Sequence, residues 1–238
     1  MKKALAFFLL FGLALSLCAC PTNEPPVLPT GEIVYRPSRM VVRVKGEKNT
    51  DFISTETAYK YDGSGRLLSE DDGLTLITHH YDSEGKRIRS VLSSYGMPDR
   101  EHTYIYNPAG LLLQKDADGV ITTYEYDEKG RVVRELCGVE EITYRYEGDR
   151  LQEKKRTVVG NVETTLYTYA ASGVLLSASM TYVSREGYTT TGITTYVHDE
   201  DGNLLESETV ILSPGGVGYL PPEERIVEYH DYIAYEVS

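Results

Sequence analysis

The chain has 238 residues, of which 41% are hydrophobic and 25% are charged, and its formal net charge is -12. This much apolar material excludes a wholly disordered chain and suffices for one sizeable domain or two small ones. The excess of 36 Asp and Glu over 24 Lys and Arg argues against nucleic acid or an anionic bilayer as a partner, because both bind through clustered cations.

The first 20 residues predict export. Lys2 and Lys3 precede an apolar run over residues 4–17, which is too short to span a bilayer comfortably and is typical of a secretory signal. The segment Leu17-Cys18-Ala19-Cys20 resembles a bacterial lipobox. The resemblance implies that residues 1–19 are a lipoprotein signal peptide and that Cys20 carries a lipid. It also implies a cell-envelope protein anchored to a membrane and facing away from the cytoplasm; an ordinary cleaved signal or an uncleaved anchor is the alternative.

Residues 20–31 are rich in proline, with Pro21, Pro25, Pro26 and Pro29 close together. Proline favours extended polyproline II, so we expect a semi-rigid linker. Residues 32–54 follow as two expected strands, Glu32–Arg36 and Met40–Val44, that cap the sheet described next.

One pattern occurs seven times between residues 55 and 210: Tyr-x-Tyr-Asp, two residues, Gly, a basic or apolar residue, and an aliphatic pair. A clear copy runs from Tyr124 through Asp127 and Gly130 to Val133. The second ring position recurs at intervals of 20 to 29 residues, which is typical of a repeat architecture. Its residues are Tyr61, Tyr81, Tyr106, Tyr126, Tyr146, Tyr169 and His198.

Each copy predicts a β-hairpin. Tyr residues two apart fall on one face of a strand, so every copy contributes two rings to the same side of a sheet. Asp, two free residues and Gly suit a type I turn, in which the Asp side chain accepts from main-chain N–H groups and Gly takes a positive φ. The sequence therefore predicts an all-β fold, an antiparallel meander of consecutive hairpins in a twisted, curled sheet, preceded by a signal helix and the Pro-rich linker. We expect the ring face to be the buried one.

The segment Asp116–Val132 resembles the YD repeat of Rhs-type proteins, and the resemblance covers about residues 55–210. Family members build spiralling β-sheets that enclose cargo in large toxins, and their repeats are linked to carbohydrate binding. This chain is much shorter, so we expect an open array and do not carry cargo enclosure over. Residues 211–238 are expected to form a loop, Ser213–Pro222, and one or two C-terminal capping strands within Arg225–Tyr235.

The titratable residues do not form a recognisable catalytic or metal site. His79 and His198 occupy ring positions, so we interpret them as replacements for Tyr. Asp62, Asp82, Asp127 and Asp199 recur at the turns, whereas a catalytic pair would occur once. Cys137 has no disulfide partner if Cys20 is lipidated, and we expect it to pack as a small apolar side chain. We therefore predict no enzymatic activity, no metal and no cofactor.

The sequence favours a non-enzymatic, membrane-anchored lipoprotein whose repeats bind or scaffold a glycan or an envelope protein. Alternatives are a polysaccharide hydrolase that uses a carboxylate pair and an accessory protein of an Rhs-type toxin system. Tyr rings at a surface could stack on sugar faces, although a purely structural core is the competing interpretation. The candidate binding residues are Tyr59, Tyr61, Tyr81, Tyr104, Tyr106, Tyr124, Tyr126, Tyr144, Tyr146, Tyr167, Tyr169 and Tyr196.

Overall fold

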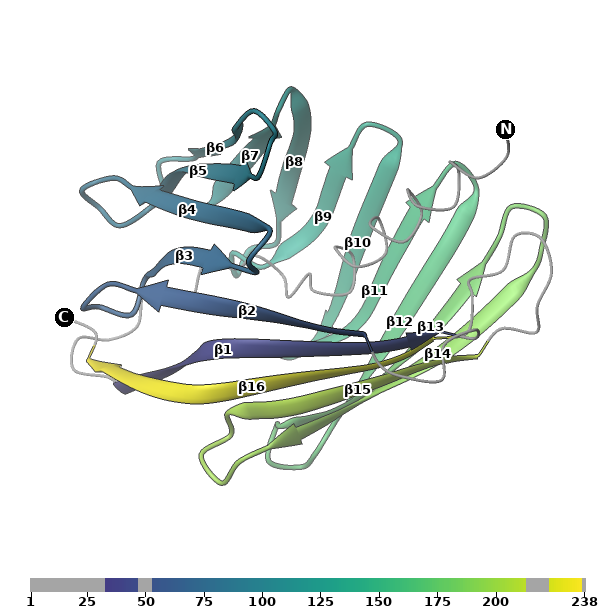
Figure 1. Ribbon diagram of the computed structural model, residues 1–238. Coiled ribbons are helices and arrows are strands. Elements are labelled where there is room, and N and C mark those ends of the chain that lie inside the picture. The colour runs from purple at the N-terminus through teal and green to yellow at the C-terminus, as the bar shows by residue number, and fades with distance from the viewer. Residues whose placement is uncertain (1–32, 47–52, 213–222, 237–238) are drawn as a thin grey trace.

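A computed structural model describes residues 33–46, 53–212 and 223–236, and these residues form sixteen β-strands (Figure 1). The signal segment, Cys20 and the Pro-rich linker lie outside the described residues. The strands are β1 (Ile33–Gly46), β2 (Ile53–Tyr61), β3 (Leu67–Asp71), β4 (Thr75–Tyr81), β5 (Arg87–Ser94), β6 (Arg100–Tyr106), β7 (Leu112–Ala117), β8 (Val120–Tyr126), β9 (Val132–Cys137), β10 (Glu140–Glu147), β11 (Arg150–Val158), β12 (Asn161–Tyr169), β13 (Leu175–Val183), β14 (Thr189–His198), β15 (Leu204–Leu212) and β16 (Glu223–Glu236).

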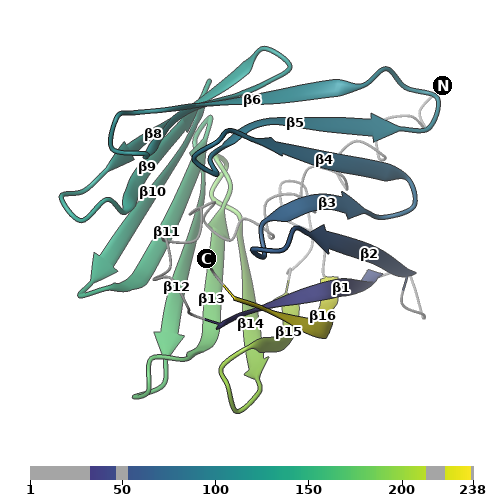
Figure 2. The same cartoon turned by 90° about the vertical axis from the view of Figure 1, so that its left-hand side faces the viewer.

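The strands pair in chain order with antiparallel neighbours, as the repeat predicted, and the first pairs with the last to close a barrel. The closing ladder runs from Ile33 opposite Glu236 to Gly46 opposite Glu223. The expectation of an open array was wrong on this point: β1 and β16 cover each other instead of capping two free edges. Figure 2 shows β1 and β16 together in the wall between β2 and β15. Each terminal segment also forms one strand within the described residues, where the sequence suggested two for residues 32–54 and one or two at the C-terminus.

A β-bulge in every repeat hairpin contributes to this closure. The ladder register shifts immediately before the second ring, so Lys60 faces Ser69 whereas Tyr61 faces Leu67, and Leu68 is the extra residue. The same shift occurs in the other six hairpins. A bulge bends its strand and increases the local twist. Seven bulges at equivalent positions therefore curl the meander in one sense, which the short repeat does not reveal.

The repeat turns follow the predicted chemistry. Asp127 Oδ1 accepts from the main-chain N–H groups of Lys129 and Arg131, each at 2.9 Å. Gly130 has a φ of 76°, and its N–H donates to the Asp127 carbonyl at 3.0 Å. An additional turn of this kind, which the sequence analysis missed, runs from Ser184 to Gly187 at the opposite end of the barrel. The sequence indicates this turn by Ser184, which lies two residues after Tyr182 and takes the place that Asp has in the repeat turns.

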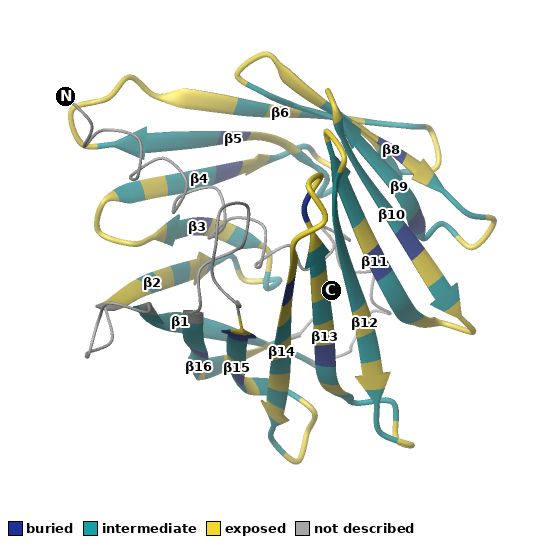
Figure 3. Ribbon diagram, turned by 90° about the vertical axis from the view of Figure 1, so that its right-hand side faces the viewer, coloured by how far each residue is buried: buried dark blue, intermediate teal, exposed yellow. Residues whose placement is uncertain are grey.

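The rings lie on the inner wall. Residues between paired rings, such as Lys60, Glu125 and Thr168, are exposed, whereas the rings themselves are partly or fully buried. The expected ring face is therefore confirmed. Burial is shallow, however, because most inward residues retain some accessible surface and buried ones are scattered along the strands (Figure 3). Tyr124, Val132 and Tyr144 form the compact apolar cluster.

Candidate functional site

In five of the seven repeat hairpins, the phenol of the second ring donates a hydrogen bond to the preceding hairpin. The phenol of Tyr126 donates to the carbonyl of Leu112 at 2.7 Å, and that of Tyr146 donates to Val132 at 3.0 Å. Each acceptor carbonyl belongs to the bulged start of the preceding return strand. Equivalent bonds run from Tyr81 to Leu67, Tyr106 to Arg87 and Tyr169 to Leu151. At the closure, Tyr61 donates to Pro37 on β1, and Tyr232 on β16 donates to Leu204 at the start of the last return strand. These phenols therefore stabilise the fold by hydrogen-bonding main-chain carbonyls of neighbouring strands.

Motif cations cover several of the same rings. The Arg131 guanidinium lies 4.4 Å from the centre of the Tyr146 ring, and that of Arg150 lies 5.7 Å from the Tyr169 ring. These are cation–π distances. Burial raises the pKa of Tyr146, against the opposing effect of Arg131. Burial likewise raises the pKa of Tyr61 to about 12. Tyr61 and Tyr146 are thus neutral, packed groups at physiological pH.

The first ring of each hairpin faces a second set of inward residues, which we call the inner row. Its members lie directly opposite the first ring in the ladder. They are Glu70, Ser90, Lys115, Glu135, Lys154, Ala178 and Ser207. Tyr or His rings therefore alternate around the wall with side chains that include carboxylates, amines and hydroxyls. Such a wall offers stacking faces and hydrogen-bonding groups together.

Two inner-row residues, Glu135 and Lys115, shift the pKa of neighbouring side chains. The Tyr144 phenol donates to Glu135 Oε1 at 2.6 Å. Burial and the Glu135 carboxylate together raise the pKa of that phenol. Further along the wall, burial and the nearby Lys115 lower the pKa of His102. The inner wall therefore keeps Tyr144 protonated and favours a neutral imidazole at His102.

His79 is the centre of a hydrogen-bonded chain. Its Nδ1 lies 2.8 Å from Ser90 Oγ and its Nε2 lies 3.0 Å from Glu70 Oε1. Ser90 Oγ is also 3.1 Å from the Tyr104 phenol oxygen. The order Glu, His, Ser is that of a nucleophilic triad, but Ser90 is only 1% exposed and cannot meet a substrate in this state. The chain satisfies buried polar groups, and His79 does more than replace a Tyr.

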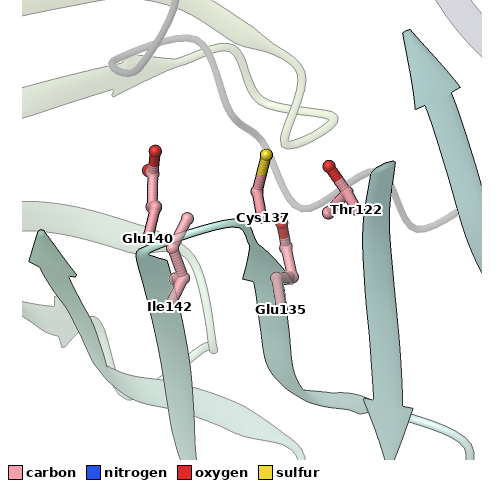
Figure 4. Close-up of a pocket in the computed structure, with 5 residues that line it drawn as sticks. All are labelled: Thr122, Glu135, Cys137, Glu140 and Ile142. Carbon is pink, nitrogen blue, oxygen red and sulfur yellow. The ribbon is translucent and has the colours of Figure 1, made fainter. Parts of the chain in front are cut away.

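A pocket of about 190 Å³ opens on the inner wall across β8, β9 and β10. Figure 4 shows Thr122, Cys137 and Glu140 pointing in the same direction from three neighbouring strands. The complete lining is Thr122, Glu135, Cys137, Glu140 and Ile142.

Both pocket carboxylates have partners. Glu135 accepts from Tyr144, and Glu140 Oε1 lies 2.5 Å from Arg156 Nε. Cys137 is a free, partly buried thiol. In the described part of the chain, no three His, Cys, Asp or Glu side chains are grouped so as to hold a metal. The pocket therefore presents a hydroxyl, a thiol, an aliphatic side chain and two carboxylates that already have partners.

The twelve predicted Tyr residues all lie on the inner wall. Ten of them form five Tyr pairs, whereas Tyr81 and Tyr196 are each paired with a His. The pocket residues Thr122, Glu135, Glu140 and Ile142 were not predicted from the sequence, and Cys137 was predicted to pack as a small apolar side chain. Their signal was available: Cys137 and Glu140 flank the two-residue turn at Gly138, and Glu135 lies five residues after Gly130, as Glu70 does after Gly65.

Comparisons with known proteins identify the repeat. The RHS Repeat family matches residues 106–136, so the chain contains an RHS repeat. No curated protein matches the chain.

Two solved structures resemble its fold weakly. A porin-like protein from Bacteroides uniformis has a TM-score of 0.42 and 15% identity, over 87% of this chain and 99% of that one. A porin-like protein from Bacteroides vulgatus has a TM-score of 0.35 and 12% identity, over 82% and 98%. These scores are too low to carry an inference about function. Within the residues that the structure describes, no helix is long and apolar enough to cross a bilayer.

Proposed function

We propose that this RHS-repeat chain is a non-enzymatic envelope lipoprotein, tethered through Cys20, whose barrel binds or scaffolds a glycan or another envelope protein. The observation that supports it most is the inner wall, where partly buried Tyr rings alternate with the inner row around the pocket at β8–β10. Aromatic faces beside paired carboxylates suit a polyhydroxylated ligand, because rings stack on its apolar faces and charged groups bond its hydroxyls.

The outer wall supports a barrel that stands in water on its linker. Arg134 pairs with Glu125 at 2.9 Å and with Glu141 at 2.6 Å. Further outward pairs are Arg39–Glu56, Arg43–Glu228, Arg89–Glu101 and Arg145–Glu153. Charged groups in contact with lipid at mid-bilayer cost about 2–4 kcal/mol for each Arg or Lys. A hydrated outer wall therefore agrees with attachment through a lipid.

Lipidation is tested with Cys20→Ser in the full chain. We expect the parent protein to incorporate labelled palmitate and to sediment with membranes, and the variant to do neither. Incorporation that persists in the variant, or membrane release without loss of label, contradicts the role of Cys20.

Ligand binding is tested on a glycan array with the full chain and two matched variants. Thr122→Arg fills the pocket, whereas Thr103→Arg places the same side chain on the exposed face of β6. We expect Thr122→Arg alone to reduce binding at least tenfold while both variants keep their circular dichroism. Equal binding by the two variants would exclude the pocket.

Incubation with each bound glycan separates binding from hydrolysis. We expect intact glycan to be recovered. Cleavage that is abolished by Glu135→Gln or Glu140→Gln would instead support the carboxylate-pair hydrolase.

A further inference from the structure

The outer faces of β12, β13 and β14 form one continuous surface without charge, which we call the neutral face. The ladder registers place its residues side by side: Leu166 faces Ser179, and Ser179 faces Ile193. These strands lie next to one another in the wall seen in Figure 3. The neutral face consists of Val162, Thr164, Leu166, Thr168, Leu176, Ser177, Ser179, Thr181, Val183, Thr189, Thr191, Ile193, Thr195 and Val197.

The rest of the outer wall differs in chemistry. On the adjoining strands the outward positions include Glu153 and Lys155 on β11 and Glu206 and Glu208 on β15. Outward ion pairs occupy β1, β2, β5, β6 and β8–β11. The neutral face is therefore bounded on both sides by charged strands and is itself made of Thr, Ser and aliphatic side chains.

We infer that the neutral face is the contact surface for a second copy of this chain. A protein with a net charge of -12 repels its own copies, because close approach brings carboxylates together. The neutral face lets two copies meet without that cost. Its aliphatic side chains, among them Ile193 at 47% and Leu166 at 48% exposed, are the apolar groups that gain from burial.

The size of the face sets the strength of the contact. Three strands about 4.8 Å apart and about 30 Å long present roughly 430 Å² from each copy. The total, on the order of 900 Å², lies below the roughly 1,200–2,000 Å² of stable specific interfaces and corresponds to a weak, reversible dimer. Confinement to a membrane raises the effective concentration and favours such a contact.

The position of β1 determines how the two barrels of the proposed dimer are oriented relative to each other. Ile33 pairs with Glu236, and nearby Tyr235 lies against Gly65 in a repeat turn, so the chain enters the barrel at the rim that carries the repeat turns. If both copies are anchored through Cys20 in one membrane, as proposed above, their barrels run parallel. The twofold axis then lies along the strands between β13 and β14. This orientation rests on the proposed anchoring; the use of the neutral face does not.

Cysteine cross-linking in membranes tests the contact with the full chain. A residue on a twofold axis meets its own copy, so Thr191→Cys, Ile193→Cys and Thr195→Cys should each give an oxidised band of twice the monomer mass. Ile105→Cys is the matched control, because Ile105 is 53% exposed on the charged part of the wall. We expect at least a fivefold higher dimer yield from each of the three than from the control.

A lysine inserted into the neutral face provides a second test of the dimer contact. Ser179→Lys in the Ile193→Cys background should abolish the dimer band, whereas Thr103→Lys should leave it unchanged. Equal yields at Ile193 and Ile105, no band at Ile193, or a band that survives Ser179→Lys would overturn the proposal, as would a cross-link to a protein of different mass. Self-cross-linking at Ile193 alone would overturn the parallel arrangement. Cys20→Ser separates this result from the anchor, because it removes the lipid and leaves the neutral face intact.

Discussion

The Tyr126 phenol donates to the Leu112 carbonyl across the boundary between two repeat hairpins, with 2.7 Å between the two oxygens. This bond satisfies a main-chain acceptor at a bulge, where the ladder itself is interrupted.

Tyr126→Phe removes that hydrogen bond and keeps the ring. A partly buried carbonyl loses its donor, so we expect the free energy of unfolding to fall by about 1–3 kcal/mol. Urea titration followed by circular dichroism measures it. Tyr95→Phe is the control, because Tyr95 is fully exposed at a turn, and it should be neutral. A loss of the same size in Tyr95→Phe would show that the Leu112 contact is not the cause.

Asp127→Asn keeps the hydrogen bonds of the turn and removes the negative charge of the carboxylate. The Arg131 side chain and the main-chain N–H groups of the turn lower the pKa of Asp127. A carboxyl whose pKa is lowered by folding stabilises the protein above its unfolded pKa, about 3.9, and that contribution is lost as the pH falls through the lower, folded value. Asn at this position keeps the turn, as Asn107 does with Ala109 and Leu111.

We therefore expect Asp127→Asn to be less stable than the parent at pH 7 and to approach it at pH 2. Thermal melts at both values measure the difference. A gap that stays constant with pH would contradict the assignment to Asp127.

Val159 has a φ of 47° in the turn between β11 and β12. A β-branched residue is strained in this left-handed region, whereas Asn tolerates it. We expect Val159→Asn to raise the free energy of unfolding by about 1 kcal/mol, because it relieves roughly that much strain. The control is Val120→Asn, at an exposed strand position with no positive φ. A gain in Val120→Asn as large as that in Val159→Asn would point to general surface polarity instead.

His79→Phe keeps a ring at the repeat position and deprives Ser90 and Glu70 of their shared partner. The buried Ser90 hydroxyl is the more sensitive group, and we expect a loss of about 1–3 kcal/mol. The double variant His79→Phe with Ser90→Ala should recover part of that loss, since the fully buried Ser90 hydroxyl is then absent. Strict additivity of the two changes in urea titrations would contradict the coupling.

The repeat predicted the hairpins, the turn chemistry and the common side of the rings, because each depends on residues close together in the chain. The bulge also depends on residues close together in the chain. Leu67 and Glu70 both face inward although they are three residues apart, and Leu68 between them faces outward. An odd spacing between two inward residues is the mark of an inserted residue.

Closure and the pocket could not be predicted in the same way. Ile33 pairs with Glu236 only because the bends at seven bulges add up, and no short segment of the sequence reveals this total curvature. The pocket depends on Thr122, Cys137 and Glu140 arriving side by side from three strands. The hydrogen bonds of His79 depend on Ser90 and Glu70, which lie in two different hairpins. The sequence alone shows only that an imidazole replaces a phenol at this position.

Because Ile33 and Glu236 are ladder partners at one rim, the order in which the sixteen strands are connected is separable from the barrel they build. A circular permutant that joins these two positions and begins at Val139, in the short exposed turn after β9, would keep every ladder. The wall has no first strand in a structural sense, and each hairpin is equivalent to the others as a place for the chain to start.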